Sequence, residues 1–188
     1  MGHAVVHNQA AEARTGPHSV RVWDRVVRLV HWGLVACVAL NLFILEDGEA
    51  PHQWVGYVAS ALVLVRMLWG FAGSKHARFH DFFPTPTCVR AHVAALLRGE
   101  APAYVGHNPL GALMMLTLLV LVMSLGLSGW LQTTDALWGN EALQELHETL
   151  AKALLGLAGL HAAAALLMGR IERVRLVRAM ITGVKEFR

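Results

Sequence analysis

The chain contains 188 residues, of which 55% are hydrophobic and 15% are charged, and its mean hydropathy is +0.46. Charged residues make up about a quarter of a typical soluble domain, so this composition excludes a disordered chain and does not fit an ordinary soluble domain. One membrane span takes about 20 residues, so the length accommodates four or five spans but not a large transporter built from two repeated halves. We therefore expect one small membrane domain.

Four apolar segments are long enough to cross a membrane. Residues 1–25, which precede them, lack the apolar core of a secretory signal and are predicted to be a cytoplasmic N-terminal leader. The sequence predicts an all-α fold, an integral membrane four-helix bundle over residues 26–168, followed by a basic cytoplasmic tail over residues 169–188. The four predicted spans are about 26–45, 51–73, 109–131 and 146–168.

The basic residues predict the orientation of these spans. Of the 16 lysines and arginines, 14 lie before or at the very start of the first span, between the second and third, or after the fourth. The two connections on the other side carry only acidic charges, which are Glu46, Asp47, Glu49, Asp135, Glu141 and Glu145. Short cytoplasmic segments retain positive charge, so both termini are predicted to be cytoplasmic, and the basic pI needs no nucleic-acid partner.

Histidines and tryptophans away from the span centres are predicted to lie at the surface or at the membrane interface. Between the prolines of the long inner connection, Val89–Leu97 is predicted to form a short amphipathic helix in the interface. The histidines expected to be solvated or interfacial include His76, His80, His92 and His107. The tryptophans expected to be interfacial anchors are Trp23, Trp32, Trp54, Trp69, Trp130 and Trp138.

Four other histidines lie within the predicted spans, where ionisable residues are costly and usually face a partner inside the bundle. His147 and His161 are 14 residues apart on one span, which is about 40° short of four turns and about 21 Å along the helix axis. They therefore share a face near opposite membrane surfaces. Because the span directions alternate, His31 is predicted at the depth of His161, and His52 at the depth of His147.

Two histidine pairs at two depths are what two bis-imidazole haem sites require. No acidic or cysteine cluster accompanies the pairs, and neither Cys37 nor Cys88 lies in the C-x-x-C-H motif of a covalently attached haem. Arg66 either pairs with a haem propionate or snorkels to the interface. Small residues near the ligands fit a haem and ordinary helix contacts equally well; they are Gly33, Gly56, Gly156 and Gly159.

Several short motifs resemble the bacterial cytochrome b561 family, which includes the b-type cytochrome subunits of nickel–iron hydrogenases. The resemblance covers about residues 20–185, and its motifs are Val22-Trp23-Asp24, Arg28-Leu29-Val30-His31-Trp32, His52-Gln53-Trp54-Val55-Gly56-Tyr57, Arg66-Met67-Leu68-Trp69-Gly70-Phe71, His107-Asn108-Pro109-Leu110-Gly111, His147-Glu148 and Leu160-His161. It implies a cytochrome of the bacterial inner membrane that carries electrons through two haems b between the quinone pool and a periplasmic partner. That partner would be a c-type cytochrome or a hydrogenase-like protein. By position, the resemblance assigns His31, His52, His147 and His161 as axial ligands.

Two other functions stay open at this point. A divalent-metal transporter would bind ions transiently at the same histidines, although level pairs do not form a continuous path for an ion. A haem-bearing membrane anchor for a dehydrogenase or hydrogenase would have the same absorption spectrum but would not react with a quinol. The sequence leaves open whether the chain has quinol or quinone oxidoreductase activity of its own.

Overall fold

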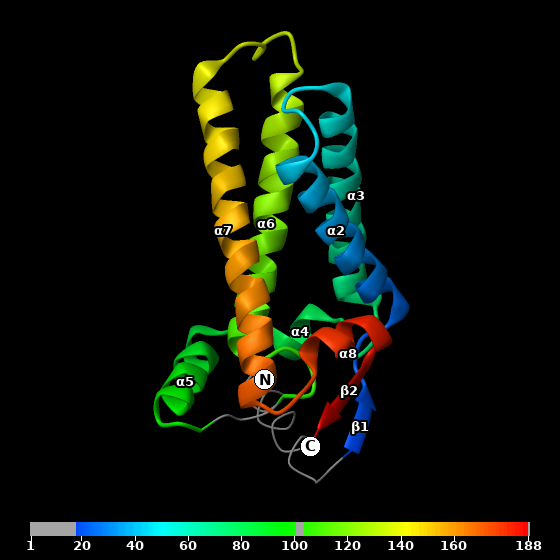
Figure 1. Ribbon diagram of the computed structural model, residues 1–188, viewed down its shortest axis with the longest axis vertical. Coiled ribbons are helices and arrows are strands. Elements are labelled where there is room, and N and C mark those ends of the chain that lie inside the picture. The colour runs from blue at the N-terminus through cyan, green and yellow to red at the C-terminus, as the bar shows by residue number, and fades with distance from the viewer. Residues whose placement is uncertain (1–17, 101–103, 188) are drawn as a thin grey trace. The chain divides into compact units, whose positions relative to one another are not determined.

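The computed structural model describes residues 18–100 and 104–187 (Figure 1). Residues 1–17 of the predicted leader lie outside this range. The elements in chain order are β1 (His18–Arg21), α2 (Arg25–Phe43), α3 (Ala50–Ala72), α4 (Phe79–Phe82), α5 (Pro86–Leu97), α6 (Pro109–Gln132), α7 (Glu141–Ile171), α8 (Leu176–Thr182) and β2 (Val184–Phe187).

Four helices, α2, α3, α6 and α7, are long and apolar enough to cross a membrane. They coincide with the four predicted spans, so the predicted fold class, an all-α integral membrane helical bundle, is confirmed. The helix α7 begins at Glu141, before the predicted residue 146, because the Asn140 side chain accepts the Leu143 N–H at 3.0 Å and caps the helix. Likewise, Asn108 caps α6 by accepting the Gly111 N–H at 2.7 Å, with Pro109 in the first turn.

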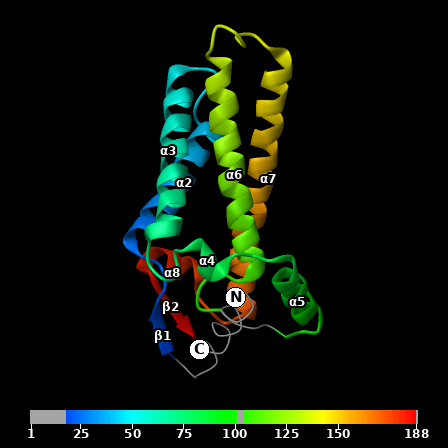
Figure 2. The same ribbon diagram turned by 180° about the vertical axis from the view of Figure 1, so that it is seen from behind.

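The chain divides into two compact units, and the second unit consists of Leu29–Met67 and Leu116–Leu160. The parts of α6 and α7 that belong to this unit run side by side in both views (Figures 1 and 2). Glycines allow its helices to approach closely. A Cβ on Gly33 of α2 would lie 2.9 Å from Leu62 Cδ1 of α3, and a Cβ on Gly126 of α6 would collide with Ser60 Oγ of α3.

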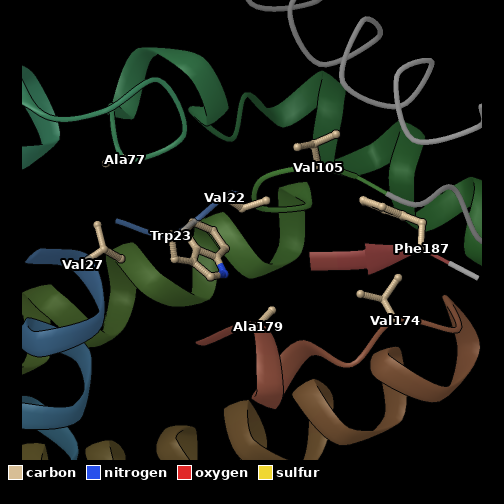
Figure 3. Packing of buried hydrophobic residues seen from close by; sticks show 8 residues of the cluster. All are labelled: Val22, Trp23, Val27, Ala77, Val105, Val174, Ala179 and Phe187. Carbon is tan, nitrogen blue, oxygen red and sulfur yellow. The ribbon is translucent and has the colours of Figure 1, made fainter. Parts of the chain in front are cut away.

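The first unit consists of Met1–Arg28, Leu68–Met115 and His161–Arg188. In it, β1 and β2 pair antiparallel, with the Cα of His18 opposite that of Phe187, so the beginning and the end of the described chain form one ribbon. Side chains from four separate stretches of sequence pack into one apolar cluster beside this ribbon (Figure 3). The buried members of this cluster are Val22, Trp23, Val27, Ala77, Val105, Val174, Ala179 and Phe187.

This cluster changes three expectations from the sequence. Trp23 is only 8% exposed and packs among apolar side chains, so the prediction that it is an interfacial anchor is wrong. The predicted tail continues into α8 and β2, and its Lys185 is buried. The predicted helix in the inner connection exists as α5, but His92 on it is 2% exposed because the helix turns it inward with Cys88, so its prediction as a solvated side chain is also wrong.

Candidate functional site

The second unit brings together two of the four predicted ligand histidines. His52 lies in the first turn of α3, and His147 lies near the start of α7. The centres of their imidazole rings are 6.3 Å apart, and the ring planes are inclined by 61°. The structure therefore brings together two histidines that the depth argument from the sequence had paired.

A hydrogen bond from α6 holds the His147 ring. The Nδ1 atom of His147 lies 2.8 Å from the hydroxyl of Ser128, which is itself only 4% exposed. The neighbouring residue is Gly129, where an added Cβ would lie 3.3 Å from His147 Cε1, a tighter contact than most real Cβ atoms make. The absence of a side chain at residue 129 thus allows the imidazole to lie close against α6 and to reach the serine.

The second ring is held mainly through its backbone. The Asn41 side-chain amide on α2 donates to the His52 carbonyl oxygen at 3.2 Å, which joins the end of α2 to the start of α3. The Nδ1 atom of His52 faces the Asp47 carboxylate across 3.6 Å, beyond normal hydrogen-bond distance. Because the Asp47 side chain is 95% exposed, its charge is largely screened by solvent.

The spacing of the two rings fits one metal ion between them. A metal–imidazole bond is about 2 Å long, and a ring nitrogen lies about 1.2 Å from the ring centre, so two axial imidazoles place their centres about 6.4 Å apart. The observed separation is 6.3 Å. In both rings Nδ1 faces a protein group, which leaves the Nε2 atoms as the ligands that could hold a haem iron.

The glycines beside the ligands fall into two groups. Gly33 and Gly56 have side chains of neighbouring helices within 4 Å of the position of an added Cβ, as ordinary helix contacts do. Gly156 and Gly159 on α7 have no atom within that distance and are exposed, so neither lies at a close helix contact in the structure. Among the described residues, no three or more His, Cys, Asp or Glu side chains gather in the manner of a cage for a bare metal ion.

The remaining predicted site residues are placed individually. His31 on α2 is half-buried in the second unit, and His161 on α7 is half-buried in the first unit, so their pairing stays a prediction. Arg66 on α3 is 4% exposed, which contradicts the expectation that it could snorkel to the interface. A buried guanidinium is costly unless it is paired with an anion.

The first unit contains a buried polar cluster that the sequence did not predict. The Lys185 ammonium donates to the carbonyl oxygens of Tyr104 and Gly106, the latter at 3.5 Å. Burial lowers the pKa of this ammonium to about 8, and the Glu172 carboxylate opposes that shift. Burial also raises the pKa of Glu172, although Lys185 and a hydrogen bond from the Asn108 amide at 3.3 Å act in the opposite direction.

His92 extends this cluster. Its Nδ1 atom lies 3.3 Å from the Tyr104 hydroxyl, and burial lowers the pKa of the imidazole. The ring is therefore disfavoured as a cation in the folded protein. The cluster has no metal-site geometry, and it lies in the unit that contains the β1–β2 ribbon.

Comparison with known proteins identifies a family that covers most of the chain. The family model for prokaryotic cytochrome b561 matches residues 22–183. The chain is similar to two proteins named probable Ni/Fe-hydrogenase B-type cytochrome subunit. The protein from Bradyrhizobium diazoefficiens is 24% identical over 98% of this chain and 93% of its own length. The protein from Rhodobacter capsulatus is 27% identical over 90% of this chain and 82% of its own length. A protein of the same name from Cupriavidus necator is 30% identical over half of each chain. No solved structure matches.

The chain belongs to the prokaryotic cytochrome b561 family, because the family model covers most of its length. It is accordingly a multi-pass membrane protein that binds haem b and takes part in transmembrane electron transfer.

Proposed function

We propose that this cytochrome carries electrons across the membrane through two bis-histidine haems b, between the quinone pool and a periplasmic redox partner. The observation that carries the proposal is the facing pair His52 and His147, with ring centres 6.3 Å apart. That spacing suits two imidazoles that would bind one iron, and ionisable residues on membrane-spanning helices usually face a partner inside the bundle.

His52 and His147 would hold the first haem through their Nε2 atoms. The iron of haem b supplies a one-electron carrier that alternates between the ferric and ferrous states. The chain contributes the two imidazoles, their fixed orientation and an apolar surrounding that keeps water away. The hydrogen bond at Ser128 and the backbone bond from Asn41 supply the orientation.

His31 and His161 would hold the second haem. The two residues lie on spans of opposite direction at the same predicted depth, which supports the pairing. Arg66 would provide a cation for a propionate of this haem, since its guanidinium lies inside the protein and guanidinium–carboxylate pairs form strong charge-assisted hydrogen bonds.

The proposed setting is the inner membrane of a bacterium, with both termini in the cytoplasm. The positive-inside distribution of lysine and arginine supports this orientation, and it places the haem of His52 and His147 toward the periplasm. Three relatives are named as hydrogenase cytochrome subunits, which supports a hydrogenase as the periplasmic partner, with a c-type cytochrome as the other candidate. A quinone would exchange electrons with the chain inside the membrane.

Haem counting in purified variants tests the ligand assignment. We expect His52→Ala and His147→Ala each to lose one of two haems, and to lose the same one by absorption spectrum and midpoint potential. His31→Ala and His161→Ala should each lose the other haem. His80→Ala is the matched control, because His80 is exposed and pairs with Asp81 on a short helix outside the spans.

A wild-type protein that folds without haem would refute the proposal, and so would full haem content in both His52→Ala and His147→Ala. The electron-transfer role has a separate test. The purified wild type should be reduced by a short-chain quinol or should reduce the corresponding quinone, whereas a haem-bearing anchor without redox function should do neither.

A further inference from the structure

Ser128 lies in the apolar helix α6, and its hydroxyl makes two contacts at once. Its Oγ atom lies 2.8 Å from His147 Nδ1 and donates to the Leu125 carbonyl oxygen, one turn back on the same helix, at 3.2 Å. The backbone here is also tied, because the Gln132 side-chain amide donates to the Ser128 carbonyl oxygen at 3.2 Å. Ser128 is therefore buried and fixed at both its side chain and its backbone.

The proposed role of His147 as a ligand decides the direction of the hydrogen bonds at Ser128. A serine hydroxyl has one proton, and here that proton is donated to the Leu125 carbonyl oxygen. If Nε2 of His147 binds the iron, the ring proton lies on Nδ1, and the lone pairs of Ser128 Oγ accept it across 2.8 Å. An imidazole with its proton on Nδ1 has a lone pair on Nε2, which is the form that binds a metal.

We propose that Ser128 is a positioning residue for His147: it fixes the ring orientation and tautomer and, by accepting the Nδ1 proton, lowers the midpoint potential of the haem that His147 binds. This inference depends on the proposed function, because it requires His147 to be an axial ligand. A hydrogen bond from the Nδ1–H group to the Ser128 hydroxyl oxygen increases the basicity of Nε2. A more basic ligand donates more electron density and favours the ferric state over the ferrous state.

The partner ligand lacks an equivalent acceptor. His52 Nδ1 lies 3.6 Å from the exposed Asp47 carboxylate and makes no hydrogen bond to the described residues. Ser128 is thus the one short contact to a ring nitrogen in this pair among residues 18–100 and 104–187. We therefore expect the midpoint potential of this haem to depend more on Ser128, beside His147, than on Asp47, beside His52.

Three variants separate this role from simple packing. Ser128→Ala removes the acceptor, and Ser128→Thr keeps it. Ser60→Ala is the control, because the Ser60 hydroxyl donates to the Gly56 carbonyl oxygen of its own helix, at 3.0 Å, and has no hydrogen bond to a histidine within the described residues. The readouts are haem content, the midpoint potential of each haem and the low-spin ferric EPR spectrum. None of these depends on activity.

We expect Ser128→Ala to raise the midpoint potential of one haem and to change its EPR signal, with the second haem unchanged. Ser128→Thr and Ser60→Ala should both match the wild type. Unaltered potentials and EPR signals in a haem-replete Ser128→Ala protein would overturn the proposal, as would an equal shift in Ser60→Ala.

A fourth variant keeps the proposal testable if Ser128→Ala loses its haem. Ser128→Cys offers a weaker acceptor of similar size, and it should raise the potential of the same haem, while Ser128→Thr restores the wild-type value. Identical potentials in the threonine and cysteine variants would overturn the inference. Failure of the ligand assignment has a different signature, which is a full haem complement in His147→Ala.

Discussion

Replacement of Asp24 tests how the first unit is held together. One carboxylate oxygen of Asp24 caps α2 by accepting the Val27 N–H at 2.9 Å. The other accepts the Trp69 indole N–H at 2.8 Å and the Ser74 hydroxyl at 2.7 Å. Asp24 therefore fastens the start of α2 to the end of α3 and the residues that follow it.

Asp24→Asn keeps the shape and the cap but turns an amide N–H₂ toward two donors. A hydrogen bond to a charged group contributes about 1.5–3 kcal/mol, and both contacts to Trp69 and Ser74 would be lost. Solvent reaches the half-buried carboxylate and the exposed Ser74, so we discount the sum and expect a loss of about 2–4 kcal/mol in the free energy of unfolding.

Denaturant unfolding of the haem-loaded protein in detergent measures this loss, with Ser74→Ala as the control that removes only one contact. A double-mutant cycle of Asp24→Asn with Trp69→Phe should give a coupling energy of about 1–2 kcal/mol. An Asp24→Asn protein within about 0.5 kcal/mol of the wild type would refute the assigned role of Asp24.

The pH dependence of this contribution has a definite sign. Burial tends to raise the pKa of Asp24, but the hydrogen bonds from Trp69, Val27 and Ser74 outweigh it and hold the pKa below the ordinary value of 3.8. The ionised form is thus favoured in the folded state. Its contribution is complete above the unfolded pKa and is lost as the pH falls through the folded pKa. The stability difference between wild type and Asp24→Asn should therefore shrink below about pH 4.

Two further predictions concern the same unit. The pKa of Lys185 is about 8 in the folded protein and 10.5 in the unfolded chain, so between these pH values the unfolded state binds more protons. The free energy of unfolding of the wild type should therefore rise from pH 8 toward pH 10.5, relative to that of Lys185→Met, by up to about 1.4 kcal/mol per pH unit. Equal pH slopes for the two proteins would contradict the burial of a titrating ammonium. Gly183→Ala should lower the free energy of unfolding by about 2–4 kcal/mol, because Gly183 has φ +83° and an added Cβ would lie 2.5 Å from the Trp23 carbonyl oxygen. The control is Gly139→Ala, where φ is +73° and the space is open, and it should lower the free energy of unfolding by only about 1–2 kcal/mol. Equal losses in the same unfolding assay would refute the steric argument.

The sequence predicted the spans and the His52–His147 pair because both depend on helix geometry. A charge-free apolar run determines where a helix crosses the membrane, and the fixed rise per residue determines the depth of each histidine. The predicted helix in the inner connection was found for the same reason. In each case the signal is contained in one continuous segment of the chain.

The β1–β2 ribbon could not be predicted in this way. Each strand has four residues, too few to show an alternating pattern, and the partners lie at opposite ends of the described chain. Trp23 packs in the apolar cluster beside this ribbon, Lys185 lies on β2 itself, and His92 contacts Tyr104, so the burial of each depends on contacts with distant parts of the sequence or with another element. Their residue types alone favoured the surface, because histidine, lysine and tryptophan are rarely buried completely.

Ser128 was missed for a related reason. A serine in an apolar span usually bonds to a carbonyl of its own helix, and Ser128 does so. Its second contact, to His147, depends on how α6 lies against α7, which no periodicity encodes. The signal that could have found it is the adjacent Gly129, because a serine beside a glycine near a span end is typical of a close helix contact.

Asp24 and Ser128 show how a few polar residues in or beside apolar spans determine the orientation of the helices. In a membrane-spanning helix or at its end, a polar group without a partner is costly, so its position favours only those arrangements in which a partner meets it. Apolar periodicity leaves many helix rotations nearly equal in energy, since lipid and neighbouring helices are similarly apolar. The contact between the Trp69 indole and Asp24 and the contact between the His147 imidazole and Ser128 favour one rotation over the others, and each spans 2.8 Å. A few polar contacts between helices therefore determine the orientation of side chains that apolar packing alone would leave undetermined.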